Sequence, residues 1–331
     1  MKIVQVSESE FSVQGHGVHT AFIETTRGLK KAGMIVTINK LFFKADIRHI
    51  HTVGPYSVLN LLFGSGKKIV SAHVVPASFV GSLRGAEKWL GFATWYLRWF
   101  YNRASVVIAV SDTTKNELQK IGVKRPISVV YNMIDASYYK YNARERNKLR
   151  KKFQFGPKDI VVLGNGQVQP RKRVDTFVAL AHMFPQMQFV WVGGMPFGKV
   201  AAKADEMQAM MDATPKNVQF TGVVSLSKVR EYFAAGDIFL MTSTQETFGL
   251  AVVEAAASNM PIVLRDIPDY DNTFRPYAIM CSDETFAVAI KKLSSNQEYY
   301  ALMQKKSAQL ARRYDTNAVI ERLLEVYRHA A

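Results

Sequence analysis

Two glutamates eight positions apart carry the clearest chemical signal in this 331-residue sequence. They stand in Q-E-T-F-G-L-A-V-V-E-A-A-A, where Glu246 precedes an expected helix over residues 247–257 and Glu254 lies inside it. Because the other helix residues are mostly Ala, Val and Leu, Glu254 is expected to be buried or to face a cleft. A buried carboxylate needs hydrogen-bond donors, which the hydroxyl groups of a ligand supply. Glu246 has a structural alternative, since a carboxylate before a helix can cap its free N–H groups.

The spacing of the two acids indicates the size of such a ligand. Eight residues at the helical rise span about 12 Å, which suits a sugar and a ribose joined by a diphosphate. The diphosphate would then lie over the backbone amides of residues 248–250, where Gly249 permits a close approach.

A basic cluster provides a second anion signal. In G-N-G-Q-V-Q-P-R-K-R-V-D, residues 164–175, three cations (Arg171, Lys172 and Arg173) stand just before the next expected helix. Cations at a helix N-terminus oppose its dipole unless an anion is bound there. A solvated charge cluster is the plainer reading, but the position at the end of a strand favours phosphate binding.

Two weaker signals lie in the first half of the chain. Gly15 and Gly17 precede a helix expected from residue 18, so they could admit a phosphate or simply form a turn. His73, in V-S-A-H-V-V-P, is a lone histidine at the end of an expected strand.

These segments sit on a regular alternation of short apolar runs and amphipathic helices. The expected strands cover residues 3–7, 36–41, 49–53, 69–74, 106–111 and 127–131, then 160–164, 189–193, 218–221, 238–241, 262–265 and 278–281. Such alternation predicts parallel sheets covered on both faces. We therefore predict an α/β fold of two doubly wound Rossmann-like domains facing a cleft, over residues 1–140 and 141–315, with a docking helix at 316–331.

The amino-acid composition limits the classes of protein to which the chain can belong. A hydrophobic fraction of 48% indicates a folded chain, and the single Cys281 excludes an internal disulfide. Neither a signal peptide nor a membrane-spanning segment is expected. Residues 1–160 hold 25 Lys and Arg against 10 Asp and Glu, whereas residues 161–331 hold 18 against 17. This asymmetry indicates a polyanionic partner, either anionic lipid or nucleic acid.

Residues 83–103 favour the lipid. This segment, L-R-G-A-E-K-W-L-G-F-A-T-W-Y-L-R-W-F-Y-N-R, contains three of the four tryptophans, interleaved with basic residues. Aromatic and basic side chains on one helix are typical of a helix lying in the headgroup region of a membrane, although core packing is the alternative. The predicted membrane-binding residues are Arg84, Lys88, Trp89, Phe92, Trp95, Arg98, Trp99 and Phe100.

Taken together, these motifs resemble the retaining GT-B glycosyltransferases of family 4. The resemblance rests on E-x7-E after a strand, R-K-R after G-x-G, and A-V-S-D-T-T-K at residues 109–115, and it covers nearly the whole chain. In that family the C-terminal domain binds a nucleotide-sugar and the N-terminal domain binds the acceptor. The stretches G-Q-V-Q-P-R-K and R-D-I-P-D-Y-D further resemble bacterial diacylglycerol α-glucosyltransferases.

The resemblance implies residue roles. Glu246 would hold sugar hydroxyls, Glu254 the ribose, and Lys172 the diphosphate, while His73 would face the acceptor and the donor sugar. The implied donor-binding set is Gly17, Arg171, Lys172, Glu246, Thr247, Phe248, Gly249, Leu250 and Glu254. Two departures stand out, because Gln167 occupies the place of the family's arginine and Arg173 that of its glycine.

The activity implied is transfer of glucose from UDP-glucose to diacylglycerol by a peripheral enzyme at the cytoplasmic face of an anionic membrane. No cofactor and no catalytic metal are expected, since D-Y-D at 269–271 stands in a predicted loop. The alternatives are another acceptor (phosphatidylinositol, a glycosylated lipid or a polysaccharide) or another donor sugar. A basic nucleic-acid-binding protein is a further alternative, disfavoured because the aromatic residues gather on one helix.

Overall fold

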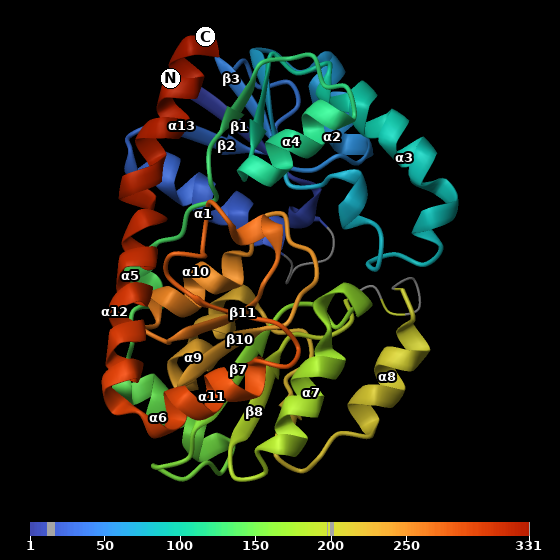
Figure 1. Cartoon of the computed structure of the whole chain (residues 1–331). Helices are drawn as coiled ribbons and strands as arrows, with labels where there is room; N and C mark the ends of the chain where they lie inside the picture. Colours follow the sequence, from blue (N-terminus) through green and yellow to red (C-terminus); the bar gives the residue numbers. More distant parts are fainter. Residues whose placement is uncertain (12–16, 197, 199–201, 331) are drawn as a thin grey trace. The chain divides into compact units, whose positions relative to one another are not determined.

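The computed structural model describes residues 1–11, 17–196, 198 and 202–330. They form two compact units (Figure 1). The first comprises Met1–Val80, Gly85–Asp135 and Tyr314–Ala331, and the second comprises Gly81–Arg84 and Ala136–Arg313.

The first unit is built on a parallel sheet in the order β2-β1-β3-β4-β5-β6. Its strands are β1 (Lys2–Val6), β2 (Ile35–Ile38), β3 (Ile47–Ile50), β4 (Lys67–Ala72), β5 (Val106–Ala109) and β6 (Ile127–Val129). Its helices are α1 (Gly17–Lys31), α2 (Pro55–Phe63), α3 (Ala86–Tyr101), α4 (Asp112–Lys120) and α13 (Thr316–Ala330). The strands β1, β3, β4 and β5 each run into a helix that returns over the sheet, whereas a loop joins β2 to β3. This is the doubly wound arrangement.

Alternation along each strand divides the core of this unit into two layers. Val4 and Val70 pack with residues of α3 and α4. Ile3 and Ile69 face the opposite side and pack with α1 and α13. Successive strand side chains point to opposite faces, so a nearly continuous apolar run fills both layers.

The second unit repeats this design with the strand order β12-β11-β10-β7-β8-β9. Its strands are β7 (Val161–Asn165), β8 (Gln188–Val192), β9 (Val218–Phe220), β10 (Ile238–Met241), β11 (Ile262–Arg265) and β12 (Ile279–Cys281). Its helices are α5 (Ala136–Tyr139), α6 (Ala143–Lys152), α7 (Val174–Met183), α8 (Ala204–Asp212), α9 (Leu226–Ala235), α10 (Leu250–Ala257), α11 (Phe286–Ser295) and α12 (Gln297–Arg313).

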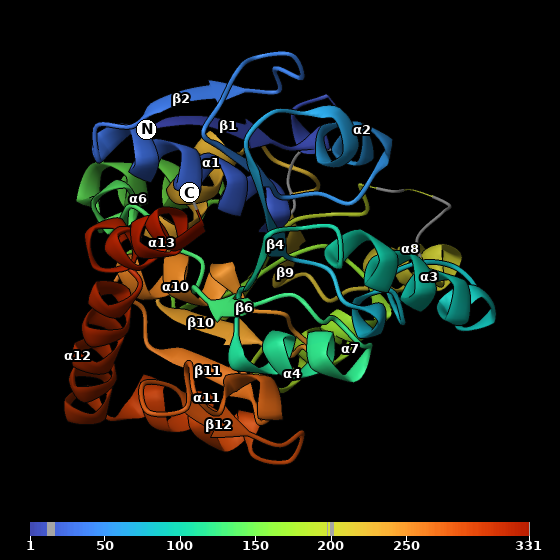
Figure 2. The same ribbon diagram turned by 90° about the horizontal axis from the view of Figure 1, so that it is seen from above.

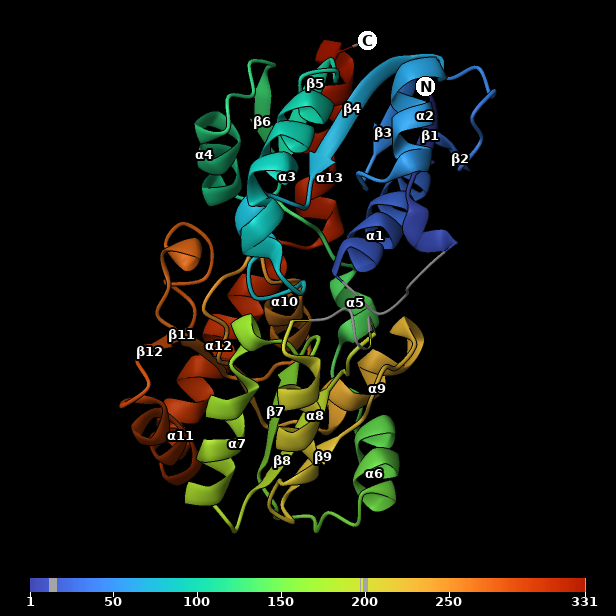
Figure 3. The ribbon, with the colours of Figure 1, turned by 90° about the vertical axis from the view of Figure 1, so that its right-hand side faces the viewer.

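Helices cover both faces of this sheet as well, with α7 and α9 on opposite sides of β7 and β8 (Figure 3). Ile238 and Leu240 of β10 pack in the cluster that includes α7 and α11. Phe239, between them, stacks on Phe233 of α9 at a ring distance of 5.8 Å. The predicted α/β fold of two Rossmann-like domains is therefore confirmed, and each of the twelve predicted strands is present with ends shifted by a few residues.

The units divide the chain after Asp135 rather than after residue 140. The reason is local packing, because α5 is held by the second unit: the hydroxyl of Ser258, the residue after α10, donates to the Tyr139 carbonyl at 2.9 Å. The C-terminal helix α13 belongs to the first unit, where Leu323 and Tyr327 lie in its core.

One predicted helix boundary is wrong. The helix expected over 247–257 begins at Leu250, and its N-cap residue Gly249 has a left-handed backbone with φ of +94°. An L side chain is strained in that region, so the glycine provides the turn into the helix. Residues 246–249 are not helical, and the 12 Å spacing obtained from the helical rise therefore does not apply.

Candidate active site

A buried ion pair lies at the ends of two neighbouring strands of the second unit. Lys172 ends a short 3-10 turn, Pro170–Lys172, that follows β7, and Glu246 lies in the segment that follows β10. The Lys172 Nζ donates to Glu246 Oε1 at 2.5 Å, and an Arg171 guanidinium nitrogen lies 3.8 Å from Glu246 Oε2. Lys172 is 7% exposed and Glu246 is 6% exposed, so both members of the pair are buried. Two cations thus face one carboxylate in an enclosed place.

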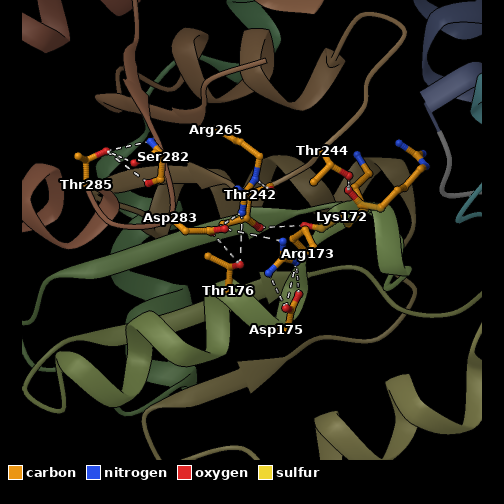
Figure 4. Close-up of polar contacts among 11 residues, drawn as sticks. Lys172, Arg173, Asp175, Thr176, Thr242, Thr244, Arg265, Ser282, Asp283 and Thr285 are labelled. Atoms are coloured by element: carbon orange, nitrogen blue, oxygen red, sulfur yellow. Dashed lines mark hydrogen bonds and ion pairs between the residues drawn. The ribbon is translucent and has the colours of Figure 1, made fainter. Parts of the chain in front are cut away.

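Main-chain contacts hold the two segments together, as Figure 4 shows in part. The Thr242 hydroxyl donates to the Lys172 carbonyl at 2.8 Å, and the Thr244 backbone N–H donates to the Arg171 carbonyl at 2.9 Å. Arg171 in turn donates to the Gln245 carbonyl at 3.0 Å. The pairing of Lys172 with Glu246 is therefore fixed by the backbone on both sides.

The electrostatics of the pair favour its ionised form. Burial by itself raises the pKa of Glu246, but the charges of Lys172 and Arg171 outweigh it, so the pKa lies below the ordinary value. Burial lowers the pKa of Lys172, and the attraction of Glu246 opposes that change. A second cation beside the carboxylate leaves this cluster with a net positive charge, which suits an incoming anion.

The third member of the basic cluster has a different role. Arg173 donates from Nε to both carboxylate oxygens of Asp175 at 3.0 Å and lies 3.8 Å from Asp283 (Figure 4). Its backbone is left-handed, with φ of +47°. A glycine adopts this left-handed conformation without strain. In this chain an arginine occupies the position, and its ion pair with Asp175 holds it there.

The second carboxylate, Glu254, lies in α10 and is 4% exposed. Its Oε1 accepts a hydrogen bond from the Tyr139 hydroxyl of α5 at 3.1 Å. The burial predicted from its apolar neighbours is confirmed. The capping alternative for Glu246 is wrong, because α10 begins after Gly249 and has no side-chain cap, while Glu246 is paired with Lys172.

Gly166 and Gly193, which directly follow β7 and β8, are explained by close packing within the chain. A Cβ at Gly193 would lie 2.1 Å from the Gly166 carbonyl oxygen, and one at Gly166 would lie 3.2 Å from Lys172 Cε. Gly166 also accepts a hydrogen bond from the Trp191 indole at 2.9 Å. These glycines let the loops after β7 and β8 pack together behind the Lys172 side chain.

Sequence reasoning missed three residues of this site. Asp269 of D-Y-D accepts a hydrogen bond from the Glu246 backbone N–H at 2.9 Å and so fixes its position. Among the described residues, the buried amide oxygens Oε1 of Gln169 and Gln245 have no hydrogen-bond partner within the chain. Gln245 directly precedes Glu246, and Gln169 lies two residues before Arg171. Buried acceptors of this kind call for donors from water or from a ligand, and their position near the charged residues is the only sequence signal for them.

In the first unit, His73 directly follows β4 and is 7% exposed. Its Nε2 lies 3.1 Å from Nδ1 of His51. Gly17 is the first residue of α1, with open space where a side chain would be. Gly15 lies outside the described residues. Thr247 and Phe248 lie in the non-helical segment before α10, and Leu250 is the first residue of that helix.

The aromatic segment forms helix α3, seen at the side of the first unit in Figure 2. Phe92 and Trp95 are 67% and 58% exposed, and Lys88 shares their face at helical spacing. Phe100 is wrongly placed among the membrane-binding residues, because it is fully buried with Leu97 in the core. Trp89 and Trp99 are half-buried, and Arg84 and Arg98 are exposed. In the described part of the chain, no helix combines the length and apolar character needed to cross a bilayer.

Comparison with known proteins places this geometry in context. The family model described as Glycosyl transferases group 1 matches residues 145–310, and Glycosyltransferase Family 4 matches residues 7–138. The chain is 31% identical to an alpha-galactosylglucosyldiacylglycerol synthase of Streptococcus pneumoniae, over all of this chain and 90% of the relative. It is 26% identical to a processive diacylglycerol alpha-glucosyltransferase of Acholeplasma laidlawii, over 82% and 80% of the two chains.

Solved structures agree with the fold. The HepE protein of Anabaena, in complex with UDP-glucose, matches with a TM-score of 0.80 at 17% identity, covering 99% of this chain and 100% of the other. A sucrose-phosphate synthase from Thermosynechococcus elongatus matches with a TM-score of 0.81 at 14% identity, covering 99% and 98%.

Proposed function

The chain belongs to the family 4, group 1 glycosyltransferases, and on this premise we propose that it transfers a hexose from a nucleotide-sugar to a diacylglycerol lipid. The observation that carries the proposal is the match of the chain, over most or all of its length, to two transferases named for diacylglycerol products or substrates. In the first version of the proposal the donor is UDP-glucose, the acceptor is diacylglycerol, and the product is α-monoglucosyldiacylglycerol.

A second candidate follows from the relative that matches the whole chain. Its name describes a galactosylglucosyl lipid. The corresponding reaction here is transfer of galactose from UDP-galactose to glucosyldiacylglycerol. Both candidates use the same donor site and a lipid acceptor, and they differ in the sugar and in the headgroup that receives it.

The proposed mechanism retains the configuration at the anomeric carbon. The acceptor oxygen bonds to C1 on the face from which the UDP departs, while the bond from C1 to the phosphate oxygen breaks. The acceptor proton passes to that departing oxygen. Lys172 and Arg171 stabilise the charge that develops on the diphosphate, a type of contribution that is usually the largest single one. Glu246 orients the sugar hydroxyls and Glu254 holds the ribose.

Attachment to an anionic membrane at the cytoplasmic face brings the enzyme to its lipid acceptor in this proposal. The exposed face of α3 supplies Lys88, Phe92 and Trp95. A second apolar surface supports the same reading, because Phe42 is 92% exposed and Phe63 is 69% exposed. The buried Arg48 donates to the Leu41 carbonyl at 3.0 Å and to Asn60 Oδ1 at 2.5 Å, which ties the loop of Phe42 to α2.

A donor and acceptor matrix tests the activity. Purified protein is incubated with radiolabelled UDP-glucose or UDP-galactose and with liposomes containing diacylglycerol or glucosyldiacylglycerol. We expect chloroform-soluble label in one of the four combinations, which identifies the sugar and the headgroup. If no lipid in any combination becomes labelled, the lipid-acceptor proposal is wrong.

Membrane attachment is tested separately. Replacing both Phe92 and Trp95 with serine removes the exposed aromatic area of α3 and should weaken binding to vesicles with anionic lipid roughly tenfold or more. Co-sedimentation measures this. Val288→Ser is the matched control, because Val288 is 65% exposed on α11 of the second unit. Equal binding by both variants would contradict the role of α3, and binding to DNA without binding to vesicles would favour a nucleic-acid partner.

A further inference from the structure

Three histidines form an enclosed row at the carboxyl ends of β3 and β4 in the first unit. His49 lies in β3, His51 follows it, and His73 follows β4; their exposures are 1%, 2% and 7%. The His51 and His73 rings stack with their centroids 5.3 Å apart. Their shared hydrogen bond joins His51 Nδ1 to His73 Nε2 at 3.1 Å. His73 therefore has a buried imidazole as a direct partner.

The far end of the row is held by residues of β1 and α13. The Gln5 side-chain carbonyl Oε1 lies 2.7 Å from His51 Nε2. The Gln5 amide nitrogen donates to the Tyr327 hydroxyl at 3.3 Å, and that hydroxyl lies 2.6 Å from His49 Nδ1. A carbonyl oxygen can only accept, so His51 must donate through Nε2.

Burial determines the charge of His49 and His51. It lowers the pKa of His51 well below its usual value, and neighbouring His49 and His73 lower it further. Burial also lowers the pKa of His49 to about 3. A neutral imidazole has one N–H, and in His51 that N–H is engaged by Gln5. His51 Nδ1 is therefore an acceptor, and the bond to His73 requires an N–H on His73 Nε2.

We propose that Gln5 and His51 are positioning residues that hold His73 in the tautomer with its proton on Nε2 and its lone pair on Nδ1. In this form the Nδ1 of His73 accepts a hydrogen bond, so it suits a hydroxyl group of a sugar or an acceptor. The identity of that hydroxyl rests on the proposed function, whereas the tautomer is inferred from contacts and burial within the first unit.

Nitrogen NMR of the full chain, labelled with ¹⁵N at its seven histidines, reads the tautomer directly. The His73 signals are assigned by their loss in His73→Gln. We expect the wild-type protein to show a protonated Nε2 and an unprotonated Nδ1 in His73. A proton on Nδ1 of His73 would overturn the proposal, and this outcome does not depend on whether a lipid is glycosylated.

Variants of His51 separate positioning from a general effect on folding. His51→Phe removes the acceptor and should leave His73 exchanging between tautomers, with turnover reduced about tenfold because its orientation is lost. His51→Gln restores a carbonyl acceptor, so it should restore the wild-type tautomer of His73 and most of the turnover. Ser71→Ala is the control, since Ser71 contacts His49 Nε2 at 2.7 Å and lies outside the bond between His51 and His73. If His51→Phe folds and keeps the wild-type tautomer and turnover, the proposal is wrong; if it does not fold, Gln5→Met provides the same comparison.

Discussion

Replacing Lys172 with methionine should lower turnover by roughly 10²–10³-fold, because a preorganised cation at a departing oxyanion contributes on that scale. Methionine keeps much of the length and apolar volume of the lysine stem, which packs near Gly166. The change therefore removes the charge with little change in shape. Steady-state kinetics with a saturating nucleotide-sugar measure the loss.

The same substitution should also destabilise the second unit. Glu246 would remain as a buried carboxylate, with Arg171 at 3.8 Å as its remaining charged partner. Breaking one member of a buried ion pair typically costs about 3–5 kcal/mol. Thermal and urea unfolding of Lys172→Met should show a loss of that order.

A double variant separates the two effects. Lys172→Met combined with Glu246→Gln leaves no uncompensated carboxylate, so most of the lost stability should return. Activity should not return, because neither the cation nor the carboxylate proposed to bind the sugar is present. Glu246→Gln alone should mainly reduce turnover through poorer positioning of the sugar. If Lys172→Met kept turnover within a factor of about ten, Lys172 would be a structural partner of Glu246 and the leaving-group role would be lost.

Most of the fold could be predicted from the sequence because its signals are local. Each strand is a short apolar run such as residues 238–241, and most strands are separated from the next by a helix. The excess of positive charge in residues 1–160 and the exposed face of α3 can also be recognised from the sequence alone. Phe100 was misassigned because one helix carries aromatic side chains on two faces, and only the packing against Leu97 and the first sheet distinguishes them.

The parts of the site that sequence could not provide depend on contacts between distant segments. The beginning of α10 is set by the left-handed Gly249, which a count of helix-forming residues does not detect. The Lys172–Glu246 pair joins residues 74 positions apart, and Asp269 fixes Glu246 from a third loop. The row from Gln5 to His73 is likewise assembled from three strands and the C-terminal helix. No spacing rule along one segment predicts such pairings.

The second large effect concerns Glu254, whose replacement by glutamine should weaken UDP binding by about 10–100-fold, since a hydrogen bond to a charged group contributes roughly 1.5–3 kcal/mol. Glutamine keeps an oxygen that can accept from Tyr139, so the packing of α5 on α10 should be retained. Its amide group, however, replaces one carboxylate oxygen that would accept hydrogen bonds from the ribose hydroxyls in the proposed site. Calorimetric titration with UDP measures the change.

Tyr139→Phe is the matched control for this experiment. It removes the hydroxyl that donates to Glu254 Oε1 at 3.1 Å but leaves the carboxylate intact. If Glu254 binds the ribose, Tyr139→Phe should change UDP affinity much less than Glu254→Gln does. If Glu254 serves only to anchor α5, the two variants should lose similar stability and neither should lose UDP affinity. Unchanged affinity in Glu254→Gln would therefore make the ribose assignment wrong, and the buried carboxylate would be a structural acceptor for Tyr139.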